Sequence, residues 1–301
     1  MKNIILVNIL IHFCFYINAQ NTESIVIGTK VTIYSKVLNE NRKIWIYAPA
    51  NTSPSVISDK RYPVLYLLDG DAHFFSTVGI VQQLSQANGN GVLPEMIVVA
   101  IENTNRLRDL TPRLPPVDNM ENSNPFVRFL SSELIPFIEK NYNTAPYKVL
   151  VGHSLGGLTA IDIMANFPQI FNSYIAIDPS LWYNGEKYLN SYLDKLPVQN
   201  LQGRKLFIGT ANTAPKGMSL EKIKTYQTAE TQHIRSILKF DKFLNTVAEN
   251  SELVYSHKYY NNDRHNTVPL ISAYDGLRFI FEYYFFDANE KDFADSTMLI
   301  A

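Results

Sequence analysis

The sequence Gly152-His153-Ser154-Leu155-Gly156 constrains the fold of this chain more than any other segment. It directly follows the apolar run 147–151 and precedes the helix-like stretch 158–167. The order is therefore a strand, a sharp turn and a helix, with a serine at the tip of the turn. Glycine two residues before and two residues after the serine lets the backbone bend tightly without a clash. The pattern predicts a serine hydroxyl that a base can reach; an ordinary tight turn that carries a serine is the alternative.

Two other strands appear earlier in the chain. Residues 63–68 and 96–101 are continuously apolar, as expected of strands that are buried on both faces. The stretch 73–86 between them can form a helix. This strand–helix–strand order predicts a mostly parallel central sheet with crossover helices, which is the α/β class.

The rest of the sequence extends this α/β pattern. Residues 25–36 and 43–48 alternate polar and apolar side chains, which favours an antiparallel hairpin at a sheet edge. The remaining elements that we expect are helices over 124–141, 221–245 and 268–285 and strands over 171–177, 205–209 and 253–260. Residues 20–301 contain no internal repeat and no obvious linker, so we expect them to form one domain.

The first 19 residues resemble a secretory signal. Lys2 gives a positive start, residues 4–17 are mostly apolar, and Ala19 is a small residue suited to cleavage. We therefore expect an exported protein, periplasmic or secreted, without a stable membrane span once the signal is removed; a retained anchor is the alternative. The single cysteine, Cys14, lies in this segment, so the mature chain is expected to have no disulfide, thiol nucleophile or cysteine metal site.

Composition excludes some function classes. Charged residues make up 18% of the chain, and the formal net charge is −1. A nucleic-acid-binding domain usually carries a marked basic excess, which is absent here. We expect no nucleic-acid partner. The sequence does not indicate an oligomeric state.

A serine hydroxyl needs a base and oxyanion donors before it can act as a nucleophile. In proteins with this type of turn, the histidine base follows the serine in sequence. The candidates are His233 in an amphipathic helix, His257 in an alternating strand, and His265 in a polar turn between the last strand and the last helix. We favour His265, because a loop at the carboxyl edge of the sheet would bring it near Ser154.

The acid that would orient the histidine is harder to identify. The loop 210–217, which follows the strand 205–209, contains no carboxylate. We favour Asp178, because strand ends hold side chains rigidly and this residue ends the strand 171–177. Glu221, Glu230 and Asp263 are alternatives, as is a serine–histidine dyad without an acid.

Two backbone N–H groups are expected to stabilise the oxyanion. The first is that of Leu155, directly after the serine, and the second is that of Asp71, where Gly70 permits a sharp turn after the strand 63–68. An ordinary strand-ending turn is the alternative for the second loop. We expect Gly70, His153 and Trp182 to contact substrate. The mouth of the pocket is expected to include His73, Asn103, Arg106, Arg108 and Arg113.

Four blocks together make the chain resemble a known family. They are residues 66–71 (YLLDGD), 152–157 (GHSLGG), 178–182 (DPSLW) and 263–265 (DRH). The chain resembles the "putative esterase" family of α/β hydrolases, which includes siderophore esterases of the enterobactin and bacillibactin type, S-formylglutathione hydrolases, feruloyl and acetyl-xylan esterases, and mycolyltransferases.

The resemblance implies one α/β-hydrolase domain, with a mostly parallel sheet and helices on both faces, and chemistry on acyl esters. It implies that Ser154 is the nucleophile, that His265 is the base, and that Leu155 and Asp71 supply the oxyanion hole. Siderophore esterases commonly carry an acidic residue after the strand that matches 205–209, and this chain departs from them there.

These observations predict an exported serine ester hydrolase that forms an acyl-enzyme and needs neither a metal nor an organic cofactor. The expected partner is a small-molecule ester, and family analogy favours a siderophore or polyphenolic ester. The alternatives are an acetyl or feruloyl polysaccharide esterase, an acyltransferase on the same fold, and a binding protein that has lost the chemistry.

Overall fold

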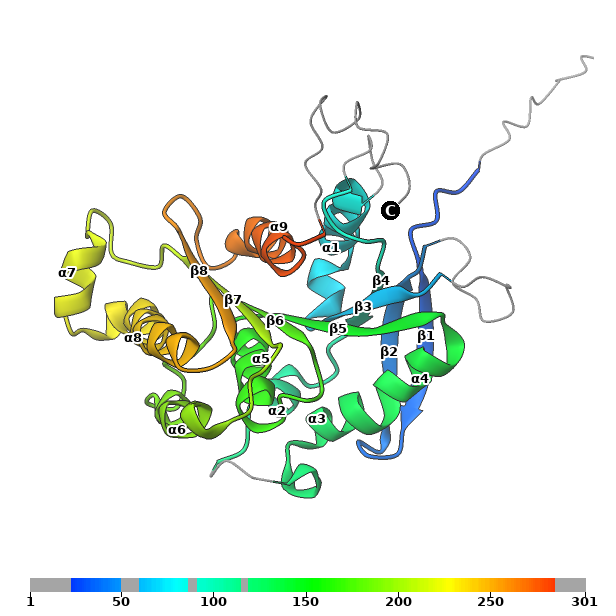
Figure 1. The fold of residues 1–301 in the computed structure, drawn as a ribbon, viewed down its shortest axis with the longest axis horizontal. Coiled ribbons are helices and arrows are strands. Elements are labelled where there is room, and N and C mark those ends of the chain that lie inside the picture. Colours follow the sequence, from blue (N-terminus) through cyan, green and yellow to red (C-terminus); the bar gives the residue numbers. More distant parts are fainter. Residues whose placement is uncertain (1–22, 50–59, 86–90, 115–118, 285–301) are drawn as a thin grey trace, which may run out of the picture.

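An eight-stranded sheet forms the centre of the molecule (Figure 1). The computed structural model describes residues 23–49, 60–85, 91–114 and 119–284. The strand order is β1-β2-β4-β3-β5-β6-β7-β8. The strands are β1 (Thr29–Ser35), β2 (Glu40–Tyr47), β3 (Tyr62–Leu67), β4 (Ile97–Ile101), β5 (Thr144–His153), β6 (Ser173–Ile177), β7 (Lys205–Ala211) and β8 (Val254–Tyr260).

The pairing of the strands confirms the predicted mostly parallel sheet. β1 and β2 form the expected antiparallel hairpin, and β2 also pairs antiparallel with β4. All other neighbours pair in parallel, from β4 through to β8. The carboxyl ends of these parallel strands therefore meet at one edge of the sheet, where open α/β sheets bind their ligands.

Helices cover both faces of the sheet, as predicted. In Figure 1, α1 (Gly70–Ser85) and α9 (Val268–Ile280) lie on one face, and the other helices of the core lie on the opposite face. Those of the second layer are α2 (Arg106–Leu110), α3 (Pro125–Phe129), α4 (Ile135–Asn141), α5 (Leu155–Asn166), α6 (Lys187–Lys195) and α8 (Ala229–Glu249). Each face has its own hydrophobic cluster, because the strands send alternate apolar side chains to the two sides.

Two helices differ from the sequence-based prediction. The continuous helix expected over 221–245 is wrong: α7 (Leu220–Thr225) and α8 are separate. The chain breaks there because Thr228 caps α8: its side chain accepts the backbone N–H of Thr231, and its own backbone N–H donates to Thr231 Oγ1. The helix expected over 73–86 begins earlier, at Gly70, directly after Asp69 with φ of 53°.

The helix predicted over 124–141 is present but irregular. Between α3 and α4, residues Leu130–Leu134 form a π-helical segment, η3. Pro136 lies at the start of α4 and has no backbone N–H to complete the regular ladder, which is a common cause of such a segment. Two short 3₁₀ helices, Met120–Asn122 and Leu196–Val198, complete the chain order.

The expected signal at 1–19 lies outside the described residues. The last helix, predicted over 268–285, ends earlier, at Ile280, and residues 281–284 form a turn. None of the helices that the structure describes is long and apolar enough to cross a bilayer.

Candidate active site

Ser154 stands at a strained turn between β5 and α5. Its backbone has φ of 59° and ψ of −116°, a conformation that non-glycine residues rarely adopt. Gly152 makes the turn possible, because a Cβ atom there would lie 2.2 Å from the carbonyl oxygen of Gly156. The predicted strand–turn–helix is therefore present, and it raises the serine hydroxyl above the carboxyl edge of the sheet.

The structure brings Ser154, His265 and Asp178 together. Ser154 Oγ lies 3.1 Å from His265 Nε2, and His265 Nδ1 lies 2.5 Å from Asp178 Oδ2. The three residues come from the ends of β5, β8 and β6, over a sequence separation of 111 residues for the first pair. This connectivity is that of a serine–histidine–carboxylate triad.

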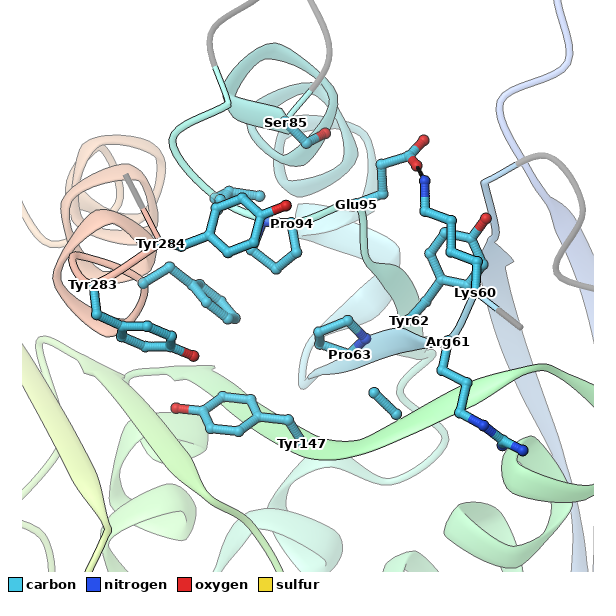
Figure 2. Close-up of a pocket in the computed structure, with 13 residues that line it drawn as sticks. Lys60, Arg61, Tyr62, Pro63, Ser85, Pro94, Glu95, Tyr147, Tyr283 and Tyr284 are labelled. Carbon is cyan, nitrogen blue, oxygen red and sulfur yellow. Dashed lines mark hydrogen bonds and ion pairs between the residues drawn. The ribbon is translucent and has the colours of Figure 1, made fainter. Parts of the chain in front are cut away.

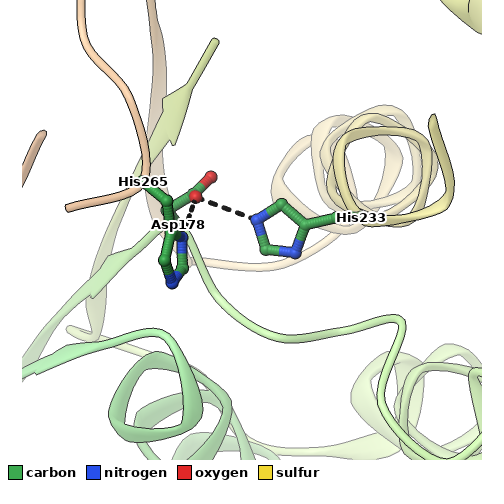
Figure 3. Close-up of side chains that lie close together, drawn as sticks. All are labelled: Asp178, His233 and His265. Atoms are coloured by element: carbon green, nitrogen blue, oxygen red, sulfur yellow. Dashed lines mark hydrogen bonds and ion pairs between the residues drawn. The ribbon is translucent and has the colours of Figure 1, made fainter. Parts of the chain in front are cut away.

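Asp178 is fully buried, and three groups hold its carboxylate by hydrogen bonds. Oδ1 accepts the backbone N–H of Ala211 at 3.0 Å. Oδ2 lies 2.8 Å from His233 Nε2 and 2.5 Å from His265 Nδ1 (Figure 3). Burial raises the pKa of Asp178, but the hydrogen bonds from the two histidines outweigh it, and the pKa falls to about 2. The carboxylate is therefore ionised at neutral pH despite its burial.

His233 is the site residue that sequence reasoning passed over. The sequence indicates only a candidate base in an amphipathic helix, yet α8 turns the ring of His233 onto Asp178 (Figure 3). Its ring also packs edge-on against Trp182, with ring centroids 6.5 Å apart. Only the packing of α8 over the end of β6 makes this contact, and local sequence carries no signal for it.

The other candidate acids lie elsewhere. Glu221 is exposed on α7, and Glu230 is exposed in the first turn of α8. Asp263 accepts a hydrogen bond from Thr267 at 3.1 Å. His265 Nδ1 instead faces Asp178, so the geometry selects Asp178 among the four carboxylates.

The two expected oxyanion donors begin helices beside the serine. Leu155 is the first residue of α5, and Asp71 is the second residue of α1. The first N–H groups of a helix have no intrahelical partner and can point at an anion. Their two turns are adjacent, since a Cβ atom on Gly156 would lie 3.3 Å from Asp69 Oδ2. The roles of both N–H groups remain predictions.

One cavity of about 440 Å³ opens beside the serine toward α1 and α2. The residues that line it include Ser154, His265, His153, His73, Asn103 and Arg106.

Burial, with smaller effects of His265 and His73, lowers the pKa of His153 to about 4, so its imidazole is neutral at pH 7. Gly70 is buried, and a Cβ there would meet the backbone of Ala100 at 2.7 Å; its contact with substrate remains a prediction.

The arginines expected at the mouth have different surroundings. Arg106 lines the cavity, but it binds Asp69 through two nitrogens, at 2.6 and 2.9 Å. Arg108 pairs with Glu40 and Asp109, and Arg113 donates to the carbonyl oxygen of Asn122. The cavity wall therefore carries an ion pair and not an unpaired positive charge at Arg106.

A second cavity of about 420 Å³ opens from the same serine toward α8. Its wall combines Ser154 and His265 with Ser180, Trp182, Thr213, Gln232 and His233. Ser180 Oγ lies 3.1 Å from Ser154 Oγ. Trp182 is 40% exposed, so its ring is available to a ligand in this cavity.

A cavity of about 560 Å³ lies away from this site (Figure 2). Tyr62, Tyr147, Tyr283 and Tyr284 line it, together with the ion pair of Lys60 and Glu95. Tyr147 stands in the first half of β5, whereas Ser154 follows the carboxyl end of that strand. The cavity therefore belongs to the opposite edge of the sheet and does not contribute to the serine site.

Comparison with known proteins identifies the family of the chain. A family model described as "Putative esterase" matches residues 35–230. The chain is 32% identical over 178 residues to the ferri-bacillibactin esterase BesA of Bacillus subtilis, covering 52% of this chain and 60% of that protein. It is 25% identical over 246 residues to the siderophore triacetylfusarinine C esterase of Aspergillus fumigatus, covering 73% and 82%.

Solved structures extend the similarity to the whole fold. An IroE-like serine hydrolase from Shewanella oneidensis superposes with a TM-score of 0.73 at 31% identity, covering 86% of this chain and 82% of that one. The siderophore hydrolase EstA from Aspergillus nidulans has a TM-score of 0.67 at 20% identity, covering 85% and 95%, and at that identity it supports the fold alone. The sheet and both helix layers are thus those of α/β hydrolases.

Proposed function

Because the chain belongs to the "Putative esterase" family, which includes carboxylic-ester hydrolases, we propose that it cleaves esters by a serine mechanism through an acyl-enzyme. The observation that carries this proposal is the 3.1 Å contact between Ser154 Oγ and His265 Nε2, backed by the buried carboxylate of Asp178. A hydroxyl that can lose its proton to a neighbouring imidazole is the nucleophile that ester cleavage requires.

The proposed reaction has two halves. In the first, Ser154 Oγ attacks the ester carbonyl while its proton passes to His265 Nε2, and the alcohol leaves with that proton. In the second, His265 takes a proton from water, the resulting hydroxide attacks the acyl-enzyme, and Ser154 Oγ regains the proton as the carboxylic acid leaves. The N–H groups of Leu155 and Asp71 would stabilise the negative oxygen in both halves.

Asp178 is proposed to orient His265 and to stabilise its imidazolium. His265 Nδ1–H donates to Asp178, so the lone pair of Nε2 faces the serine. His233 and the N–H of Ala211 hold the carboxylate from two further sides. We assign His233 as a positioning residue, since it reaches Asp178 and not the reacting serine.

The proposed substrate is a siderophore or polyphenolic ester. Two relatives have names that describe ester hydrolysis of siderophores, ferri-bacillibactin in one and triacetylfusarinine C in the other. Two cavities of about 440 and 420 Å³ share Ser154 and His265, which gives room for substantial groups on both sides of a scissile ester. Trp182 in the second cavity supplies a face on which an aromatic ring can stack.

Export and a single catalytic domain over residues 20–301 are part of the proposal. The support is the signal-like segment 1–19 and the single sheet that the described parts of the chain share. N-terminal sequencing of the protein recovered from the producing cells should begin after residue 19. A chain that keeps residues 1–19 would contradict cleavage of the signal.

The serine mechanism is tested with Ser154→Ala and a fluorophosphonate probe. We expect the wild-type protein to hydrolyse a short p-nitrophenyl ester and to be labelled at Ser154, and the variant to lose the label and about 10³-fold or more of kcat/KM. Ser180→Ala is the matched control, because Ser180 Oγ lies 3.1 Å from Ser154 Oγ and could otherwise be the labelled group. Labelling that survives Ser154→Ala but is lost in Ser180→Ala would refute the assignment.

The substrate class is tested by saturation kinetics on ferric enterobactin and on methyl ferulate. A higher kcat/KM on the siderophore supports the proposed class. Preference for the ferulate, or for acetylated polysaccharide, would assign the protein to the polysaccharide esterases. New esters formed with added alcohol or sugar acceptors, without hydrolysis, would identify a transferase.

A further inference from the structure

The carboxylate of Asp178 receives two imidazoles on one oxygen. Asp178 follows β6, His233 is part of α8, and His265 follows β8, so three separate elements meet at this point (Figure 3). Each side chain offers one metal-ligand atom, and the three atoms all lie within 4.8 Å of one another. Two imidazole nitrogens and one carboxylate oxygen are a donor set that zinc and copper dications favour.

We propose that Asp178, His233 and His265 form an inhibitory site for Zn²⁺ or Cu²⁺. This inference rests on the proposed function, because it assigns a regulation to the same serine site. In the metal-free protein the three side chains are held by hydrogen bonds, and in the metal-bound protein one dication replaces the two N–H protons that now lie between them.

The hydrogen-bonded geometry is close to what coordination requires. His265 Nδ1 and His233 Nε2 lie 2.5 and 2.8 Å from the same oxygen, Asp178 Oδ2. Zinc bonds to imidazole nitrogen and carboxylate oxygen of about 2.0–2.2 Å place tetrahedral ligands roughly 3.3 Å apart. The two histidines therefore have to withdraw from the carboxylate by less than about 1 Å, and their nitrogens, which lie within 4.8 Å of each other, have to approach by up to about 1.5 Å.

A dication can approach the two histidines from the second cavity, and Asp178 lies directly behind them. His233 and His265 both form part of the wall of that 420 Å³ space, and their side chains are 16% and 35% exposed. No lysine or arginine stands among the described residues that line it, so its wall does not repel a cation. Water in the cavity can occupy the open coordination position.

Metal binding at this place would remove the base. The metal takes the lone pair of His265 Nδ1, and each neutral ring moves its single N–H proton, by exchange with solvent, to the nitrogen that does not bind the metal. A neutral imidazole that is metal-bound at Nδ1 therefore carries its only N–H proton on Nε2. Nε2 then donates to Ser154 Oγ and has no lone pair to accept the serine proton, so acylation stops until the metal leaves.

The experiment uses the mature full-length protein with Co²⁺ as a spectroscopic probe and Zn²⁺ as the inhibitor. We expect one equivalent of Co²⁺ to give the visible bands of a four- or five-coordinate site. Zn²⁺ should lower the rate on a p-nitrophenyl ester more than tenfold, and EDTA should restore it. Each rate is expressed relative to the same protein without metal.

His233→Gln removes a ligand but keeps an amide that can donate to Asp178. It should weaken Co²⁺ binding and Zn²⁺ inhibition by about tenfold or more, in line with the cost of disturbing metal-site contacts. His233→Asn serves as a second variant if the first unfolds. His257→Gln is the matched control, since His257 faces one carboxylate, that of Asp241, and should bind metal no differently from wild type.

Two results would overturn the proposal. One is Zn²⁺ inhibition of His233→Gln at the concentration that inhibits wild type, and the other is the absence of Co²⁺ bands at stoichiometric metal. The esterase proposal fails separately: a protein that binds Co²⁺ normally but cleaves no ester would refute the function and leave the metal site standing.

Discussion

The molecule contains two sets of neighbouring side chains in which a hydroxyl, an imidazole and a carboxylate follow one another. In one, Ser154 Oγ lies 3.1 Å from His265 Nε2, and His265 Nδ1 lies 2.5 Å from Asp178. In the other, Thr210 Oγ1 lies 2.8 Å from His257 Nε2, and His257 Nδ1 lies 3.4 Å from Asp241. The order of the three groups is the same, although His257 and Asp241 are joined only by this 3.4 Å contact and not by a hydrogen bond.

Their surroundings do distinguish them. Thr210 is fully buried within the regular strand β7, where a substrate cannot approach its hydroxyl. Ser154 has a positive φ at the tip of a turn and forms part of the wall of two cavities. A triad-like order of hydroxyl, imidazole and carboxylate is therefore not in itself a catalytic site. It can do chemistry only where backbone strain and open space expose the hydroxyl.

The largest expected difference between the two sets of side chains is the loss of kcat/KM when the histidine of each set is replaced. His265→Ala should lower kcat/KM on a p-nitrophenyl ester by about 10³-fold or more, because the serine loses its base. His257→Ala should leave kcat/KM within about threefold, although it removes a buried hydrogen bond. The measurement is initial-rate kinetics on both variants, with melting curves to show that each is folded. Equal losses in the two variants would show that His257 is needed for the reaction as much as His265.

The next effect separates the buried acid from the exposed ones. Asp178→Asn should lower kcat/KM about 10²- to 10⁴-fold, because the amide cannot stabilise an imidazolium and can fix the wrong tautomer of His265. Glu221→Gln and Glu230→Gln should change it less than about twofold, since both side chains are exposed on helices. The three variants are assayed on one ester at one pH.

A full rate in Asp178→Asn would show that Ser154 and His265 act as a dyad. A large loss in Glu221→Gln or Glu230→Gln would instead mean that α7 or α8 moves when substrate binds.

A smaller effect concerns the stability of the folded protein at acidic pH, to which His153 beside the serine contributes. Burial lowers the pKa of His153 from 6.5 to about 4, with His265 and His73 adding to it and Asp178 and Asp69 opposing it. Between pH 6.5 and 4 the unfolded chain therefore takes up a proton that the folded chain refuses. The free energy of unfolding should fall by up to about 3 kcal/mol over this range.

His153→Gln should flatten that decrease, because glutamine does not titrate. Urea unfolding at pH 7, 5.5 and 4 measures the slope for wild type and variant. The prediction concerns the slope and not the absolute stability, so a general loss of packing does not obscure it. An unchanged slope would mean that His153 is not kept neutral by burial.

The smallest effect concerns Thr210. Thr210→Val keeps the shape of the side chain but removes its hydrogen bond with His257, which should cost about 1–3 kcal/mol of unfolding free energy. The measurement is urea unfolding at neutral pH, with kcat/KM as the control. A loss of activity in the folded variant would contradict a purely structural role for Thr210, His257 and Asp241.

Much of the fold could be predicted because its signals are local. The continuous apolar runs around Val64 and Val98 predicted buried parallel strands, and the two glycines around Ser154 predicted the turn. The break between α7 and α8 was missed, because the amphipathic pattern continues through 226–228 and the cap at Thr228 is subtle. Periodicity finds helices better than it finds their ends.

The site was predictable in part for the same reason. Ser154, His265 and Asp178 each follow a strand, and the carboxyl ends of parallel strands meet at one edge, so topology alone favours their meeting. His233 follows no such rule. It lies one turn inside a 21-residue helix, and its contact with Asp178 depends on how α8 packs over the sheet, which one sequence does not reveal.

The position of Asp178 has a consequence for engineering. Since the carboxylate is anchored at the end of β6, the loop 212–219 after β7 carries none of the three side chains of the serine site, yet it contributes Thr213 to the wall of one cavity. The loop beyond Asn212 can therefore be exchanged, whereas Asn212 has to stay, because it hydrogen-bonds Asp263 and Asn261 in the turn that leads to His265. Grafting segments of other lengths and compositions there should change which esters the protein accepts, while Ser154, His265 and Asp178 keep their positions.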